Sequence, residues 1–120
     1  MAIPATIHDV IMARVDSLHE DTKKLLQTGS AIEREFQYEL IKHLTGMSEK
    51  ELLSNLSILK DAELLYERGI YPETTYIFKH ALTREVVYNS ILKKQKKRLH
   101  GKIGKAIEDL YKKILMNFMR

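Results

Sequence analysis

Five histidines, at positions 8, 19, 43, 80 and 100, are the side chains best suited to acid–base or metal chemistry near neutral pH. No two of them have the H-x-x-x-H spacing that places two imidazoles on one helix face for a metal ion. The chain has no cysteine, which excludes thiolate metal sites, disulfides and cysteine nucleophiles. No short motif marks a serine nucleophile, and no G-x-x-x-x-G-K-[ST] loop is present to hold the phosphates of a nucleotide. We therefore expect no catalytic residue, no metal site and no independent enzyme activity.

Positive charge is concentrated in the last third of the chain. Residues 1–78 contain 8 Lys and Arg against 13 Asp and Glu, whereas residues 79–120 contain 12 against 3. The densest stretch predicts a basic docking patch, made of Lys93, Lys94, Lys96, Lys97, Arg98, Lys102 and Lys105. Such a patch attracts DNA, anionic lipid or an acidic protein surface, although a solvated helix junction has the same composition.

Length and composition describe one globular domain, or one domain with a helical appendage. The 120 residues are 44% hydrophobic and 30% charged, with 5 Gly and 2 Pro, which excludes disordered and low-complexity classes. No run approaches the roughly 20 apolar residues of a membrane span, and the first residues lack the basic start and apolar core of a signal peptide. We expect a cytoplasmic protein without a membrane span.

The first half of the chain begins with two predicted helices. Apolar residues at helical spacing predict the first over 6–18. The second begins at the capping-box pattern Ser17-x-x-Glu20, or later behind Asp21, and an extended link at 33–36 follows it.

Two further helices follow the link. The first of them covers 37–45 and stops at Gly46, because a glycine suits the residue after a helix. The next covers about 48–62 and opens with the capping box Ser48-x-x-Glu51.

The period then changes to that of strands. Runs at 64–68 and 75–78 predict a hairpin with a loop of about five residues. Helical spacing returns over about 80–93 and 95–116, and we expect the break between these two helices within 93–98.

The predicted fold is mainly α with a small β-hairpin. Three helices followed by a hairpin is the winged-helix arrangement, a variant of the helix-turn-helix, here with helical extensions at both ends. Residues 37–45 and 48–62 take the two helices of the turn motif, and residues 64–79 take the wing.

A winged helix that reads DNA needs Lys, Arg, Asn or Gln facing outward from the helix in the recognition position. Three such side chains lie among four carboxylates here: Lys50, Asn55 and Lys60 among Glu49, Glu51, Asp61 and Glu63. Phosphate contacts dominate DNA affinity, so DNA reading by this helix is not favoured. A DNA-binding module would have to use the basic region 93–105.

Three stretches resemble the STAND class of signalling ATPases, which are large P-loop proteins with an AAA+-like core. Residues 3–18, IPATIHDVIMARVDSL, are similar to the segment that leaves the ATPase core. Residues 21–36, DTKKLLQTGSAIEREF, resemble the family pattern k-x-L-L-q-x-A-s-V-I-G-R-E-F. Residues 76–92, YIFKHALTREVVYNSIL, resemble Y-x-F-K-H-A-L-x-Q-E-V-A-Y-x-S-L-L, the most specific of the three.

The resemblance implies a winged-helix domain that packs on an ATPase core in the ADP-bound state and moves away on exchange to ATP. Residues 1–18 would link to the missing core, 19–79 would be the winged-helix domain, and 80–120 would be a helical extension towards a missing C-terminal repeat or output domain. In related resistance-type members, a Met-His-Asp motif places its His on the β-phosphate of ADP. His80 stands in the similar place, with Ala81 where the Asp would be. ATP or ADP would belong to the parent protein, and the fragment itself would hold no cofactor.

We therefore expect a regulatory module, not an enzyme, that packs on the ATPase core and relays its nucleotide state to an output domain. A DNA-binding transcriptional regulator is the alternative, and an interaction scaffold without nucleotide coupling is the third candidate. The sequence stays apolar through 114–120, which predicts a fragment whose exposed former interface would invite self-association.

Overall fold

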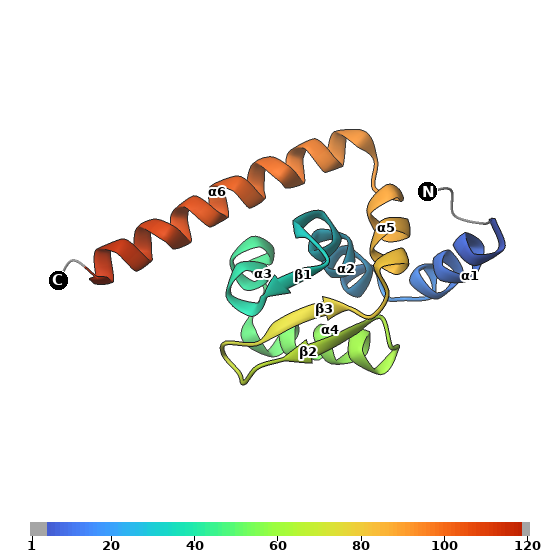
Figure 1. Cartoon of the computed structure of the whole chain (residues 1–120), viewed down its shortest axis with the longest axis horizontal. Helices are drawn as coiled ribbons and strands as arrows, with labels where there is room; N and C mark the ends of the chain where they lie inside the picture. Colours follow the sequence, from blue (N-terminus) through green and yellow to red (C-terminus); the bar gives the residue numbers. More distant parts are fainter. Residues whose placement is uncertain (1–4, 119–120) are drawn as a thin grey trace.

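The computed structural model describes residues 5–118, which form a mainly helical protein with one small antiparallel sheet (Figure 1). Its helices are α1 (Ala5–Asp16), α2 (Glu20–Ile32), α3 (Tyr38–Thr45), α4 (Glu49–Asp61), α5 (Ala81–Asn89) and α6 (Lys93–Phe118). Its strands are β1 (Glu35–Gln37), β2 (Leu65–Arg68) and β3 (Thr75–Phe78). The first residues of the predicted linker 1–18 and the last residues of the apolar run 114–120 lie outside the described residues.

The predicted helix signals are confirmed at α3 and α4. Gly46 ends α3 in the left-handed conformation, with φ of 64°. Ser48 caps α4, and its Oγ accepts a hydrogen bond from the Glu51 amide at 3.2 Å. Both signals are local, so the flanking residues alone determine them.

The predicted start of α2 is wrong. Neither Ser17 nor Asp21 caps this helix; the N-cap is His19, whose Nδ1 accepts from the Asp21 amide at 3.5 Å. The Ser17 hydroxyl instead donates to the Arg14 carbonyl at 2.8 Å. The Ser17 side chain therefore bonds to the backbone at the end of α1 and does not cap α2.

The sheet has three strands rather than the two of the predicted hairpin. The hairpin of β2 and β3 forms as expected, but the link predicted as extended becomes β1 and pairs with the other edge of β3. Two backbone bonds of 2.9 Å flank this pairing, from the Phe78 amide to the Arg34 carbonyl and from the Tyr38 amide to the Thr74 carbonyl. Strand β3 is therefore central, and its second edge is not left open.

The main core lies between the sheet and helices α2 and α4. Leu25 and Leu26 of α2 are buried in it. The other buried members are Val15, Phe36, Tyr38, Ile41, Leu52, Leu56, Leu59, Leu64, Leu65, Tyr76, Phe78 and Val87. Helix α1 is only partly covered, since Ile7 and Val10 are 44% and 61% exposed.

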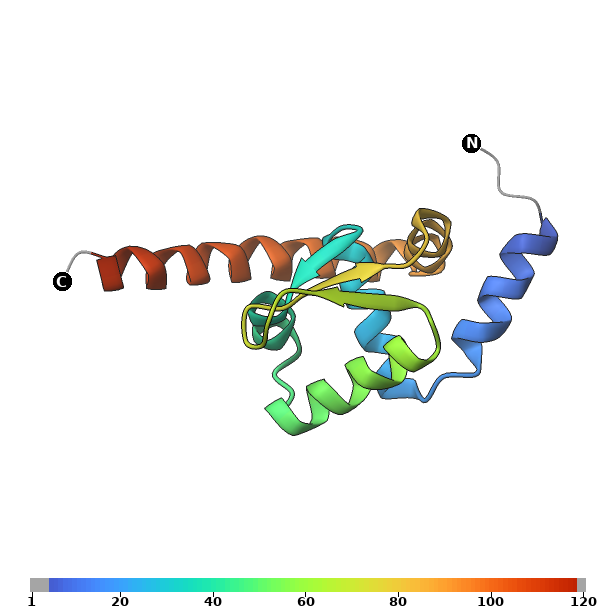
Figure 2. The same cartoon turned by 60° about the horizontal axis from the view of Figure 1, so that its bottom comes forward.

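The break between the last two helices is not within 93–98, as predicted, but at 90–92. Ser90 ends α5, and its hydroxyl donates to the Val87 carbonyl at 2.6 Å. The lysine-rich run therefore forms the first turns of α6, because Lys, Gln and Arg are good helix formers. Figures 1 and 2 both show α6 on the side of the molecule opposite α4.

Candidate functional site

His80 occupies the N-cap position of α5, directly after the sheet. Its backbone has φ and ψ of −127° and 134°, and its carbonyl accepts from the Thr83 amide at 3.0 Å. Its side chain is exposed and makes no capping hydrogen bond. Within the described residues the imidazole therefore caps no helix amide, and it is accessible to an external group.

The cations nearest to His80 in the sequence are engaged elsewhere. Lys79 Nζ lies 3.5 Å from Glu63 Oε2, and Arg84 Nε donates to the Ser30 carbonyl at 2.8 Å. The basic patch begins only after α5, whose nine residues span about 13 Å. The structure therefore does not bring His80 together with the predicted patch.

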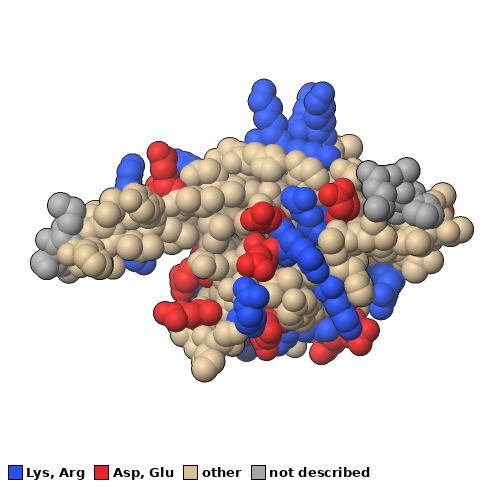
Figure 3. All heavy atoms as spheres, in the orientation of Figure 1, with Lys and Arg blue, Asp and Glu red and all other residues tan. Residues whose placement is uncertain are grey.

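The patch itself lies along α6 and faces two directions. Lys93, Lys94 and Lys97 are exposed, and Figure 3 shows basic side chains projecting from this end of α6. Lys96 differs, because its Nζ lies 4.5 Å from the centre of the Tyr88 ring. None of the patch residues forms an ion pair with a carboxylate of residues 5–118.

Arg98 and Lys102 turn towards α2, where they line a groove of about 200 Å³. We call this the α2–α6 groove. Its remaining lining residues are Lys24, Gln27, Thr28, Ile91, Gln95 and Leu99. Lys102 also lines a neighbouring hollow of about 240 Å³ with Lys105, beside His43 and Asp109. Part of the predicted patch is therefore the wall of a concave surface.

The surface made by α4 and the hairpin differs from the basic patch, because most of its charged side chains are acidic. We call it the α4–wing surface. Two of its cations are paired with carboxylates: Lys60 Nζ lies 2.9 Å from Glu67 Oε1, and Arg68 Nη2 lies 3.3 Å from Glu35 Oε1. Its other exposed charges include Glu49, Lys50, Glu51, Asp61 and Glu73. Phosphates would therefore meet mostly carboxylates here.

Apolar side chains complete the α4–wing surface. Ile70, at the tip of the hairpin, is 86% exposed, and Tyr66 and Tyr71 are each 47% exposed. Ile70 and Tyr71 also line a groove of about 480 Å³ between the hairpin and α4. An apolar tip beside a groove provides the contacts that a protein partner buries.

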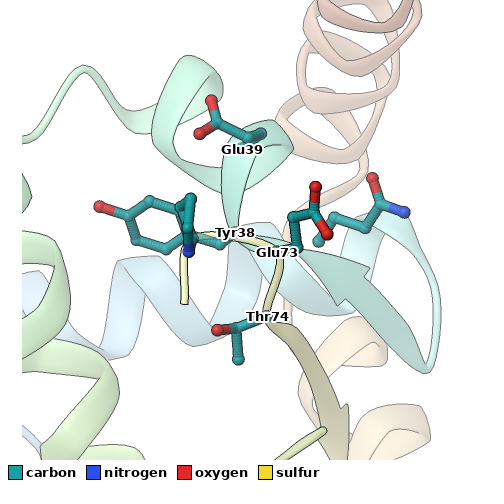
Figure 4. Close-up of a pocket in the computed structure, with 6 residues that line it drawn as sticks. Tyr38, Glu39, Glu73 and Thr74 are labelled. Carbon is teal, nitrogen blue, oxygen red and sulfur yellow. The ribbon is translucent and has the colours of Figure 1, made fainter. Parts of the chain in front are cut away.

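A separate hollow of about 370 Å³ lies between β1, α3 and the hairpin loop, and Tyr38, Glu39, Glu73 and Thr74 contribute to it. Figure 4 shows the Tyr38 hydroxyl pointing away from the Glu73 side chain. That hydroxyl is buried without a hydrogen-bond partner among residues 5–118. Burial raises the pKa of the Tyr38 phenol, and the carboxylates of Glu49 and Glu39 raise it further.

Within residues 5–118, no group of three His, Asp or Glu side chains is placed to hold a metal ion. No helix of this part of the chain is both long enough and apolar enough to cross a bilayer. Comparison of the sequence with protein-family models finds no match, and comparison with curated proteins finds none either. The resemblance to STAND-class ATPases therefore rests on its motifs alone.

Sequence reasoning missed the contribution of α2 to the groove. Lys24, Gln27 and Thr28 lie about seventy residues before Arg98 and Lys102 in the chain. No motif in α2 indicates a shared surface, because only the packing of α6 on α2 creates it. The ion pair between Lys60 and Glu67 was also missed, because only the turn from α4 into β2 brings these two side chains together.

Proposed function

We propose that this chain is the regulatory winged-helix module of a larger STAND-type ATPase. In this proposal residues 19–79 pack on the nucleotide-binding core, residues 1–18 link to that core, and residues 80–120 relay its nucleotide state to an output domain. The order of α2, α3, α4 and the hairpin supports the winged-helix assignment, because three helices followed by a hairpin define that arrangement. The three motif stretches support the choice of ATPase class.

The α4–wing surface is the observation on which the proposal mainly depends. In a DNA reader this surface would present unpaired cations to phosphates. Here Lys60 and Arg68 are paired with carboxylates, and Ile70 at the tip of the hairpin is 86% exposed. An apolar tip suits burial against a protein, and the pairing of Lys60 and Arg68 with carboxylates reduces the unpaired charge that has to be desolvated around it.

His80 would couple this packing to the nucleotide. An exposed imidazole without an internal hydrogen bond is available to donate to a phosphate oxygen of ADP held by the parent's core. The amides of the first turn of α5 lie beside it, and that turn contains no acidic residue. Both features favour an anion near His80.

The test is the rate at which the full-length protein releases a fluorescent ADP analogue. We expect His80→Ala to accelerate release about tenfold, because one charge-assisted hydrogen bond is lost. Ile70→Asp should also accelerate release, because it weakens packing on the core. Leu92→Asp is the matched control, since Leu92 is 69% exposed but lies outside the α4–wing surface. Wild-type rates in both test variants, or equal acceleration by the control, would refute the proposal.

The alternative, a DNA-binding module, has one observation in its favour. Lys93, Lys94 and Lys97 are exposed and make no ion pair among residues 5–118. Fluorescence anisotropy of a labelled mixed-sequence duplex tests this alternative. Sub-micromolar binding at about 0.15 M salt, abolished by charge reversal of these three lysines, would favour it over the regulatory module.

A further inference from the structure

The α2–α6 groove combines positive walls with an apolar floor. Lys24 approaches it from α2, and Arg98 and Lys102 approach it from α6. Ile91, which is 4% exposed, and the half-buried Leu99 form the floor. No Asp or Glu lines this groove. Three cations thus converge on one concave, partly apolar surface without a neutralising carboxylate.

These cations differ from those of the α4–wing surface, because they are not paired. Lys24, Arg98 and Lys102 form no ion pair with any carboxylate of the part of the chain that the structure describes. Unpaired like charges at one site repel each other. A bound anion would remove that repulsion, so the groove is complementary to a ligand that supplies carboxylates or phosphates.

The lining distinguishes a protein ligand from a nucleic acid. Single-stranded nucleic acids bind through aromatic side chains on which bases stack, in addition to cations, and no aromatic residue lines this groove. A duplex presents phosphates and sugar, which gain nothing from the apolar floor of Ile91 and Leu99. An amphipathic helix places apolar and acidic side chains side by side, and it matches both the floor and the walls.

The groove continues along α6, which gives the ligand an extended track. The next hollow shares Lys102 and adds Lys105, and it ends where His43 and Asp109 face each other across 3.7 Å. From Arg98 to Lys105 the helix rises about 10 Å, or two turns. A ligand helix of a few turns can therefore contact several of these cations at once.

We propose that the α2–α6 groove is a docking site for an acidic amphipathic helix of a partner protein. Carboxylates of that helix pair with Lys24, Arg98 and Lys102, and its apolar side chains lie on Ile91 and Leu99. This site does not depend on the α4–wing surface or on His80. It gives the module a second contact, on the side opposite α4 (Figure 2).

The test uses a labelled synthetic peptide of about 15 residues, near the length at which isolated helices begin to form. The peptide has Leu at helical spacing and Glu at the flanking positions, and its binding to the whole chain is followed by anisotropy at about 0.15 M salt. The triple variant Lys24→Glu, Arg98→Glu, Lys102→Glu should weaken binding at least about tenfold. The matched control Lys93→Glu, Lys94→Glu, Lys97→Glu has the same net charge and should change binding less than about threefold.

Three controls distinguish helix docking from misfolding, from general charge attraction and from nucleic-acid binding. All six substituted side chains are exposed, so both triple variants should fold. Circular dichroism of the two variants checks this. A peptide with Ser in place of Leu should bind clearly more weakly, because it cannot use the apolar floor. Equal weakening by the two triple variants would overturn the proposal in favour of unspecific charge attraction. Tighter binding of a mixed-sequence duplex than of the peptide, weakened by the groove variant and not by the control variant, would overturn it in favour of nucleic acid.

Discussion

Replacing Gly29 with alanine tests how closely α2 packs on the unexpected strand β1. A Cβ at Gly29 would lie 2.6 Å from Phe36 Cε1 and 2.8 Å from Cζ, well inside the optimal carbon–carbon separation of about 3.5–4.0 Å. The Phe36 ring is 3% exposed and packs against Tyr76 and Phe78, with ring centres 6.1 Å and 6.3 Å away. The ring therefore has little room to move.

Two effects of opposite sign decide the result. Overpacking a core costs about 1–3 kcal/mol, whereas alanine in a helix gains about 1 kcal/mol over glycine. We expect Gly29→Ala to lower the free energy of unfolding by about 1 kcal/mol net. In a Phe36→Leu background the clash is relieved, and the same Gly29→Ala change should raise the stability instead.

Urea unfolding followed by far-UV circular dichroism measures both changes, provided that the m-value stays constant. Gly101→Ala is the matched control, because Gly101 is an exposed helical glycine and a Cβ there meets nothing within 4 Å. The control should stabilise the protein by about 0.5–1 kcal/mol. If Gly29→Ala raises the urea midpoint as much as the control does, the packing of Phe36 on α2 is wrong.

Three further predictions concern single polar or backbone features. Thr22 Oγ1 donates a hydrogen bond to Asn55 Oδ1 at 2.6 Å between α2 and α4. In urea unfolding, Thr22→Val should therefore lower the free energy of unfolding by about 1–3 kcal/mol, and Thr22→Ser should lower it by less. Equal losses in the two variants would contradict this hydrogen bond. Gly46 has a φ of 64°, so Gly46→Ala should lower the melting temperature by an amount corresponding to about 1–2 kcal/mol, and Gly46→Asn by less, because Asn tolerates this conformation better. Burial, and then the carboxylates of Glu49 and Glu39, raise the pKa of Tyr38 in the folded protein. In the unfolded chain the phenol ionises near pH 10, whereas in the folded protein it is still protonated there. The free energy of unfolding should therefore fall as the pH rises above about 10. Tyr38→Phe should make this decline shallower in urea titrations at alkaline pH, and an unchanged slope would exclude Tyr38 as its source.

Local signals in the sequence predict most of the helical architecture. Gly46 and Ser48 mark the ends of α3 and α4 because their conformations depend on neighbouring residues only. The hairpin follows from the change of period. Strand β1 is predicted only as extended, since its three residues gain their partner from β3, about forty residues later. A segment this short has too little periodicity to indicate a strand.

In the candidate sites too, local features are predictable from the sequence and long-range contacts are not. The position of His80 at the start of a helix is predictable, because it follows a β-like run and precedes helical spacing. Composition identifies the basic patch but not its two faces. The division between Lys93 and Arg98 depends on which side of α6 packs on α2, and that contact is long-range. The predicted break in the helix is misplaced because a run of lysines does not by itself end a helix.

Strand β3 pairs on one edge with β2, which is near it in the sequence, and on the other edge with β1, which is far from it. This difference affects how the sheet folds. The hairpin with β2 closes a loop of six residues, and hairpins of this kind form in about 1–10 μs. Pairing with β1 closes a much larger loop, because the chain between Glu35 and Ile77 includes α3, α4 and β2. The entropy of closing that larger loop slows the step. The β1 edge should therefore form late in folding and be the first part of the sheet to open, which amide hydrogen exchange resolves strand by strand.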